Sequence, residues 1–459
     1  MLASIVNTFR NCFKIPELKS RILFTLVVLG ICRLAAVIRV PGLDGQKLLE
    51  YFNDPARRGG GGLLGMYSMF TGGALEHCAV AALGIMPYIS ATIIIQLLGA
   101  VVPQLSKLAR EEGGRPKLIQ YGRYLTVVLC LGQGFVMALG WENAANIFPG
   151  FKGNLVLYNN LWWYRFQTMF VLTTGTLLLM WLGEQITERG IGNGVSLVIT
   201  IGILARLPAA YAGLKVAFFS SADNESRLNL GHGIILIALL VVVVAGVVAV
   251  TQAQRKIPVQ YAQRAVGRKV YAGGTSFMPL RVNYSGVMPI IFAQCLLTFP
   301  GLVFENLGRR FDITFLKQLA AQMHDRSLLY LSLYGLLILF FSYFWVATQF
   351  NELQIADDLK KNGGYIPGVR PGQATSGFLH NAMQRITLAG AVFLVIIAVI
   401  PNLLYKTMTI DYSVASFFGG TSLLITVGVM LDTMRQMESH LLMRHYDGFL
   451  KKGRIRGRF

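Results

Sequence analysis

Charged side chains are scarce in this sequence. Only 14% of its 459 residues are Asp, Glu, Lys or Arg, against about 25% in an ordinary soluble domain. This deficit excludes a soluble globular enzyme. Five cysteines in so long a chain exclude a disulfide scaffold, and the lack of a three-residue glycine period excludes collagen. Because 54% of the residues are hydrophobic, disorder is excluded as well. A polytopic membrane protein remains.

Constellations of residues that carry out reactions are also missing. HExxH, G-x-S-x-G and Walker A motifs are absent, and the six histidines show no metal-ligand spacing. The glycine-rich run 190–194 lacks the strand context of a nucleotide site, so we interpret it as a tight turn. An ion-coupled transporter usually keeps an ionisable group at mid-membrane, and the apolar runs offer almost none. We expect no catalytic residue, no metal ligand and no cofactor, and a protein that is not an enzyme.

Long apolar runs are what the sequence has in abundance. Ten are candidates to cross a bilayer, and eight of them contain no Asp, Glu, Lys or Arg. Arg33 and Arg39 lie toward one end of the first run, and Arg206 and Pro208 interrupt the fifth. Because the runs are continuous and do not alternate, they predict helices rather than a barrel. The runs are residues 22–40, 77–102, 124–140, 166–183, 195–214, 232–251, 286–304, 328–350, 386–404 and 413–431.

Basic residues predict the orientation of the chain in the membrane. If the N-terminus is cytoplasmic, the segments on that side hold 27 of the 42 Lys and Arg residues and 11 of the 22 Asp and Glu residues. The positive-inside rule counts Lys and Arg and favours this orientation, with both termini in the cytoplasm. The first run is followed by arginines rather than a cleavage site, which predicts a retained helix. Residues 1–21 have the spacing of an amphipathic helix on the inner leaflet.

Two of the runs contain similar hexapeptides. Residues 84–89 (GIMPYI) in the second run resemble residues 286–291 (GVMPII) in the seventh. Ten runs divide into two halves of five. Because five is odd, the second half would begin on the opposite side of the membrane from the first. The similarity of the two hexapeptides therefore predicts an inverted repeat. We expect the halves to be 22–214 and 215–431, followed by a basic cytoplasmic tail at 432–459. A proline that only kinks each helix is the simpler alternative.

A short apolar stretch lies between the first and second runs. It extends from Leu63 to Leu75 and is flanked by glycines. Thirteen residues are too few to span the membrane, and this length suits a re-entrant element. The flanking glycines supply flexible joints, which would allow a short helix at about 61–75 to be displaced. A static helix that fills a funnel remains the alternative.

Positive charge is concentrated in two of the predicted cytoplasmic loops. Residues 252–285 carry six basic and no acidic residues, and they alternate like strands around Gly273 and Gly274, which predicts a basic hairpin. In residues 351–385, turn-forming residues flank Arg370 and predict a stiff loop that presents this side chain outward. Anionic lipid also attracts such charge, but a long ordered loop is more typical of a protein or RNA partner.

Five motifs in this chain, in this order, resemble the SecY family of protein translocation channels over essentially the whole length. They are MFTGGALE (69–76), LGIMPYISATIIIQLL (83–98), MWLGEQITERGIGNGVS (180–196), YIPGVRPG (365–372) and FGGTSLLI (418–425). The resemblance implies an all-α polytopic membrane protein. Its ten transmembrane helices would form two inverted five-helix halves around an hourglass pore, with a short re-entrant plug helix. The second and seventh helices would face each other across a lateral opening.

The resemblance also implies roles for individual residues. Taken alone, a single aliphatic or basic residue would not indicate such a role. The implied pore ring is Ile85, Ile89, Val195, Ile199, Ile291 and Ile425. The implied plug residues are Leu63, Leu64, Met66, Tyr67, Met69 and Phe70. A polar cluster at the lateral gate would be Ser90, Gln133 and Asn283. Partner docking would use Arg255, Lys256, Arg264, Arg268, Lys269 and Arg370.

The implied function is a passive channel that translocates secretory preproteins across the bacterial plasma (inner) membrane and inserts membrane proteins laterally. Branched aliphatic side chains cannot coordinate ions, so a narrow water column between them dewets and closes the channel. The SecA motor or the translating ribosome would drive transport, and SecE and SecG would be the small membrane subunits. Signal peptides, nascent polypeptide and membrane lipids would be the other partners. A small-solute secondary transporter is the alternative, because such proteins also have inverted repeats.

Overall fold

The structure of the chain is a computed structural model. It describes residues 15–53, 67–68, 70–111, 113–144, 151, 153–208, 211–212, 215, 230–261, 264–266, 269–271, 274–310, 313–322, 327–408 and 421–452. Most of the amphipathic helix predicted at 1–21 therefore lies outside the described residues, as does the end of the basic tail.

Ten helices follow the ten apolar runs in order. They are α2 (Pro16–Ala35), α5 (Met86–Val101), α7 (Gly114–Glu142), α9 (Leu161–Arg189), α10 (Gly194–Leu204), α12 (Leu230–Gln252), α13 (Met288–Arg310), α15 (Leu328–Gln349), α17 (Gln373–Met408) and α19 (Thr421–Lys452). In the described part of the chain, five helical stretches are long and apolar enough to cross a membrane: Pro116–Glu142, Leu161–Arg189, Gly233–Gln252, Leu329–Lys361 and Gln373–Ile400. Met86–Val101, Gly194–Leu204 and Met288–Leu297 are shorter apolar helices.

The remaining elements lie in the connections. The short helices are α3 (Gly45–Asn53), α6 (Pro103–Arg110), α14 (Thr314–Gln322) and α16 (Glu352–Lys361). The strands are β1 (Gln254–Tyr261), β2 (Arg264–Val266), β3 (Lys269–Tyr271), β4 (Thr275–Arg281) and β5 (Gly364–Tyr365). The predicted loop 351–385 is thus largely regular structure, because it holds α16, β5 and the first turns of α17.

Several predicted boundaries are wrong, because hydropathy locates an apolar run and does not locate the ends of a helix. The second run was expected to begin at residue 77, but α5 begins at Met86 after a series of turns over residues 71–85. The fifth was expected to extend to residue 214, but α10 ends at Leu204, two residues before Arg206. In the opposite direction, α7, α9 and α17 continue past their apolar runs into polar sequence.

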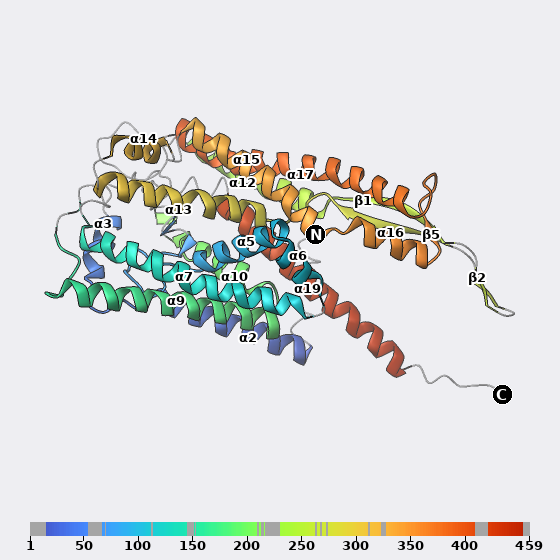
Figure 1. Cartoon of the computed structure of the whole chain (residues 1–459), viewed down its shortest axis with the longest axis horizontal. Coiled ribbons are helices and arrows are strands. Elements are labelled where there is room, and N and C mark those ends of the chain that lie inside the picture. The colour runs from blue at the N-terminus through green and yellow to red at the C-terminus, as the bar shows by residue number, and fades with distance from the viewer. Residues whose placement is uncertain are drawn as a thin grey trace.

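The long helices form two groups that meet along a limited contact (Figure 1). Helices α2, α5, α7, α9 and α10 pack on one another, and α13, α15, α17 and α12 pack as a second group. The groups touch where α5 contacts α13 and where α10 contacts α19. Helix α19 also packs against α12 and α17, so the last helix of the chain joins both groups.

The two similar hexapeptides begin their helices in the same way. Gly84 and Gly286 have φ values of 61° and 63°, a left-handed conformation that favours glycine. Pro87 and Pro289 then occupy the second residue of α5 and α13. Proline is tolerated in the first turn, where its missing N–H has no intrahelical acceptor. The alternative in which these prolines kink their helices is therefore wrong, because they lie at the helix starts.

The strands form two small sheets at one end of the molecule (Figure 1). Strand β1 is central, with β4 antiparallel on one side (Gln254 opposite Arg281) and β5 antiparallel on the other (Gln260 opposite Tyr365). Strands β2 and β3 pair beyond them, with Val266 opposite Lys269. The predicted hairpin exists, but the chain reverses between β2 and β3, so the turn expected at Gly273 and Gly274 is wrong.

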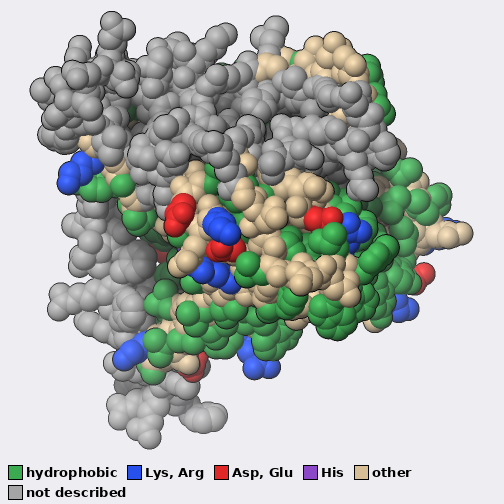
Figure 2. Space-filling model, turned by 90° about the vertical axis from the view of Figure 1, so that its left-hand side faces the viewer, with side chains coloured by type: hydrophobic (Ala, Val, Ile, Leu, Met, Phe, Trp, Pro, Cys, Tyr) green, Lys and Arg blue, Asp and Glu red, His purple; other side chains and the backbone are tan. Residues whose placement is uncertain are grey.

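Figure 2 shows the left-hand end of the view in Figure 1. Hydrophobic side chains cover much of the lower part of this face, and the few charged side chains in its middle include Lys or Arg close to Asp or Glu. The basic β1–β4 hairpin lies at the other end of the molecule (Figure 1).

Candidate functional site

The six positions expected in the pore ring come from four helices. Five of them are at most 5% exposed and belong to one buried hydrophobic cluster, against which Val195 packs. This cluster is large: it takes residues from α2, α9, α12, α15 and α17 as well as from α5, α10, α13 and α19, and so runs through both groups of helices. The six are Ile85 at the N-cap of α5, Ile89 in α5, Val195 and Ile199 in α10, Ile291 in α13 and Ile425 in α19.

Helices α5 and α13 are in direct contact in this structure. The Cys295 Sγ atom lies 3.2 Å from the Met86 Sδ atom, which joins the two helices directly. Ile290, Ile291 and Ala293 on α13 are almost completely buried. Side chains of this kind form no hydrogen bonds and coordinate no ions, so the cluster can seal a path by packing alone.

Two of the six expected plug residues lie in the described part of the chain. Phe70 is buried in the same hydrophobic cluster as five of the positions expected in the pore ring. Tyr67 belongs to a neighbouring cluster with Trp141 and Tyr164, and its hydroxyl donates to the Leu83 carbonyl oxygen at 3.1 Å. The other four expected residues are outside the described residues: Leu63, Leu64, Met66 and Met69.

Polar contacts fix the segment that contains Tyr67 and Phe70. The Arg206 Nη2 atom, just after α10, donates to Ser68 Oγ at 2.7 Å and forms an ion pair with the Glu76 carboxylate. From α2, Arg33 Nη1 donates to the Gly72 carbonyl oxygen at 3.1 Å. Sequence reasoning placed Arg33 toward one end of the first apolar run and treated Arg206 as an interruption of the fifth, and it missed these contacts. The signal that was available is the presence of a cation where the run should be uncharged.

The three residues of the expected polar cluster are placed on separate elements. Asn283 is buried before α13, where its Nδ2 donates to the Gly286 carbonyl oxygen at 3.0 Å and its Oδ1 accepts from Ser285 at 3.2 Å. Ser90 and Gln133 are half-buried on α5 and α7, which pack together. Within the described ranges no hydrogen bond joins the three, so the cluster stays a prediction.

The two basic loops, which were predicted separately, meet in one sheet. Arg255 and Lys256 lie on β1 with exposed side chains, and β5 pairs with the same strand. Arg370 follows β5 and is also exposed, as expected. Arg264 and Lys269 lie on β2 and β3, and Arg268 is outside the described residues. The structure thus brings the two loops together through β1 and β5, with Arg255 and Lys256 on β1 and Arg370 in the segment that follows β5.

A small hydrophobic cluster supports this sheet. Ile257 and Leu280 of the hairpin pack with Ile366 and with Leu379 of α17. Gly364 is required at the join, because a Cβ there would lie 2.9 Å from the Tyr261 ring. The basic side chains therefore project from a packed platform rather than from a free loop.

Comparison with known proteins agrees with this architecture. A sequence model of the SecY family matches residues 79–434. The protein translocase subunit SecY of Chlamydia trachomatis is 42% identical over 457 residues, which cover 98% of this chain and 99% of that protein. The subunit of the same name from Thermotoga maritima is 42% identical over 456 residues, with 98% and 99% covered.

Solved structures show the same fold. The structure of a protein-conducting channel superposes with a TM-score of 0.59 at 18% identity and covers 92% of each chain. Sec61 in a canine ribosome–channel complex gives a TM-score of 0.56 at 17% identity, again with 92% of each chain. These matches confirm the predicted fold class, a polytopic helical membrane protein. Because the sequence model and full-length relatives at 42% identity agree, the chain belongs to the SecY family, a family of channel subunits rather than enzymes.

Proposed function

We propose that this chain is the protein-conducting subunit of a preprotein translocase. It moves secretory preproteins across the membrane and releases membrane proteins sideways into the lipid. The observation that carries the proposal is that five aliphatic positions from four helices are buried in one hydrophobic cluster that runs through both helix groups, with Val195 packed against it. The names of the relatives, protein translocase subunit SecY, support the same conclusion.

The chemistry of the cluster suits this task. An apolar constriction stays dry and blocks ions while it is closed. An extended polypeptide that separates the helices fills the space with its own side chains, so the seal does not depend on one sequence. Release into lipid takes place between α5 and α13, where the contact consists of van der Waals packing and a weak thiol–thioether contact.

The proposed channel divides the chain into four parts. Residues 22–214 and 215–431 form the two halves, 61–75 is the plug, and 432–459 is a cytoplasmic tail that begins within α19. The membrane is the bacterial inner membrane, and both termini are cytoplasmic. The excess of Lys and Arg on the hairpin side supports this orientation.

External partners supply the energy and dock on the cytoplasmic sheet. Arg255, Lys256 and Arg370 project from its packed platform, where an acidic protein surface or ribosomal RNA phosphates bind favourably. The ribosome-bound state of the canine Sec61 structure supports a ribosome partner. SecA is the second motor, and SecE and SecG are the small subunits that accompany the channel.

The direct test of the channel is crosslinking of a stalled, half-exported preprotein. Cysteine is placed at Ile89, Ile291 or Ile425 in a chain whose native cysteines are replaced. We expect all three positions to crosslink to the stalled chain. Val242→Cys is the control, because Val242 is 68% exposed on α12. Crosslinks at Val242 with none at the three ring positions would place the path elsewhere and contradict the proposal.

The docking role is tested by charge reversal at the sheet. Arg370→Glu should reduce preprotein export at least about tenfold, because it puts a like charge against an anionic partner. Export into inverted membrane vesicles is the measurement, with the amount of inserted protein as reference. Lys360→Glu is the matched control, since Lys360 is exposed on the neighbouring α16. Equal export by both variants would remove Arg370 from the docking surface.

A further inference from the structure

The segment 67–76 is folded back on itself by two glycines. Gly72 and Gly73 have φ values of 64° and 85°, and the Gly73 N–H donates to the Ser68 carbonyl oxygen at 2.9 Å. This reversal brings the side chains of Ser68 and Glu76 together, and the Ser68 hydroxyl donates to Glu76 Oε1 at 2.9 Å. The Ser68 hydroxyl oxygen and the Glu76 carboxylate thus lie together as hydrogen-bond acceptors next to the end of α10.

Arg206 completes this group from outside the segment. Its Nη2 atom contacts both Ser68 and Glu76, so one guanidinium bridges two residues that are eight positions apart in sequence. The side chains of Arg206 and Glu76 are only 21% and 17% exposed. A partly buried ion pair that loses one member leaves the other charge without compensation, which is more costly than loss of an exposed pair.

The segment is also close-packed against α10 at this point. A Cβ on Gly72 would lie 2.7 Å from the Gly202 Cα atom, so the two backbones are in direct contact. Arg33 donates to the carbonyl oxygen of the same glycine from α2. Phe70, two residues earlier, is buried with the ring isoleucines. The position of Phe70 therefore depends on polar contacts that lie to one side of the apolar cluster.

We propose that Arg206 and Glu76 are positioning residues that hold segment 67–76 against α10 and keep Phe70 packed on the pore ring in the resting channel. This inference rests on the proposed function, because it concerns the closed state of that channel. Transport then requires the Arg206–Glu76 contact to separate as the segment leaves α10. The ring itself has no polar contact of this kind to break.

The test measures ion leak through the resting full-length protein in proteoliposomes without preprotein. Arg206→Gln and Glu76→Gln should each raise the leak about tenfold. A tenfold change in the population of the open channel corresponds to ~1.4 kcal/mol. The double variant should leak about as much as either single variant, because both remove the same contact. Arg206→Lys keeps the charge and should stay nearer to the unchanged protein.

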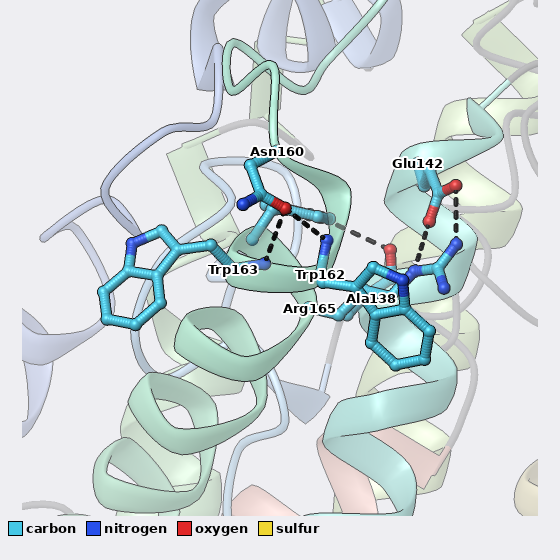
Figure 3. A network of polar contacts seen from close by, with 7 residues as sticks. Ala138, Glu142, Asn160, Trp162, Trp163 and Arg165 are labelled. Atoms are coloured by element: carbon cyan, nitrogen blue, oxygen red, sulfur yellow. Dashed lines mark hydrogen bonds and ion pairs between the residues drawn. The ribbon is translucent and has the colours of Figure 1, made fainter.

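Glu142→Gln is the matched control (Figure 3). Arg165 Nε and Nη2 donate to the Glu142 carboxylate at 2.8 and 2.9 Å, and the two side chains are 23% and 15% exposed, close to the Arg206–Glu76 pair. This ion pair joins α7 and α9. Its loss therefore removes an ion pair that is buried to a similar degree but does not contact segment 67–76. We expect Glu142→Gln to leave the leak unchanged.

Three results would overturn the inference. The first is a leak in Arg206→Gln no greater than in Glu142→Gln. The second is a double variant whose effect is the product of the two single effects, which indicates independent sites. The third is a leak in Arg206→Lys as large as in Arg206→Gln. Preprotein transport by the unchanged protein in the same vesicles separates the two proposals, because absent transport contradicts the channel itself.

Discussion

The proposed pore ring and segment 67–76 both contribute to one hydrophobic cluster, yet they are held by opposite kinds of interaction. The ring is aliphatic, and its contacts have no preferred direction. The segment is held by an ion pair and hydrogen bonds from Arg206 and Arg33, which form in one geometry only. A surface of the first kind can close around any chain, whereas a contact of the second kind defines a single resting position.

The largest effect should come from making the ring polar. Ile291→Ser with Ile425→Ser places two hydroxyls in the cluster and removes aliphatic volume from positions that are 1% and 0% exposed. Water then wets the constriction, and resting ion leak should rise by an order of magnitude or more. Each change should also cost about 2–5 kcal/mol of stability, which a thermal unfolding measurement detects.

The control for the ring is the same chemistry on an exposed helix face. Val241→Ser with Val242→Ser alters two side chains of α12 that are 58% and 68% exposed. Neither the leak nor the unfolding temperature should change much. If the two double variants leak equally, the apolar packing of the ring is not the barrier to ions.

An intermediate effect is expected from the glycines of segment 67–76. Gly72→Ala forces alanine into a left-handed conformation, which costs about 1–2 kcal/mol, and also brings a Cβ to 2.7 Å from Gly202. Gly73→Ala carries the conformational cost alone, because its nearest neighbour would be 3.8 Å away. Ion leak and thermal unfolding should both rank Gly72→Ala as the more disturbed. The reverse order would show that the close packing of Gly72 against Gly202 of α10 and Arg33 of α2 is unimportant.

The smallest effect should come from an ion pair near the surface. Arg123 donates to Glu184 at 3.0 and 2.8 Å between α7 and α9, but its side chain is 45% exposed. Exposed pairs of this kind contribute about 0.2–1 kcal/mol. Glu184→Gln should therefore lower the unfolding temperature slightly and leave the ion leak unaltered. If Glu184→Gln leaked as much as Glu76→Gln, the greater burial of the Arg206–Glu76 pair would not explain its effect on the leak.

Much of the fold was predictable because membranes impose simple rules on sequence. Continuous apolar runs gave the number and order of the long helices, and the GIMPYI and GVMPII hexapeptides indicated a relation between two of them. The structure extends that relation to the backbone, since Gly84 and Gly286 share nearly the same φ. Helix ends were not predictable from hydropathy, because α7 and α17 continue into polar sequence where packing or solvent satisfies their side chains.

The candidate site was predictable in part. Ile85, Ile199 and Ile425 were assigned through the resemblance of motifs, because a single aliphatic residue in an apolar run carries no signal of its own. Arg206 carried a signal, since a cation interrupts the run, but its partner Glu76 is 130 residues away. No local pattern connects such residues, so the contact emerges only when the chain is folded.

By itself the sequence determined that this chain is a helical membrane protein with basic loops on one side. The free energy of transferring a segment from water to lipid depends on the residues of that segment alone, so it can be read from the local composition. It also carried the motifs of the SecY family. The tertiary structure alone decided that both basic loops share one sheet, that five of the six aliphatic positions are buried in one cluster, and that Arg206 reaches Glu76. These facts depend on the close approach of distant segments, which is set by packing of the whole chain.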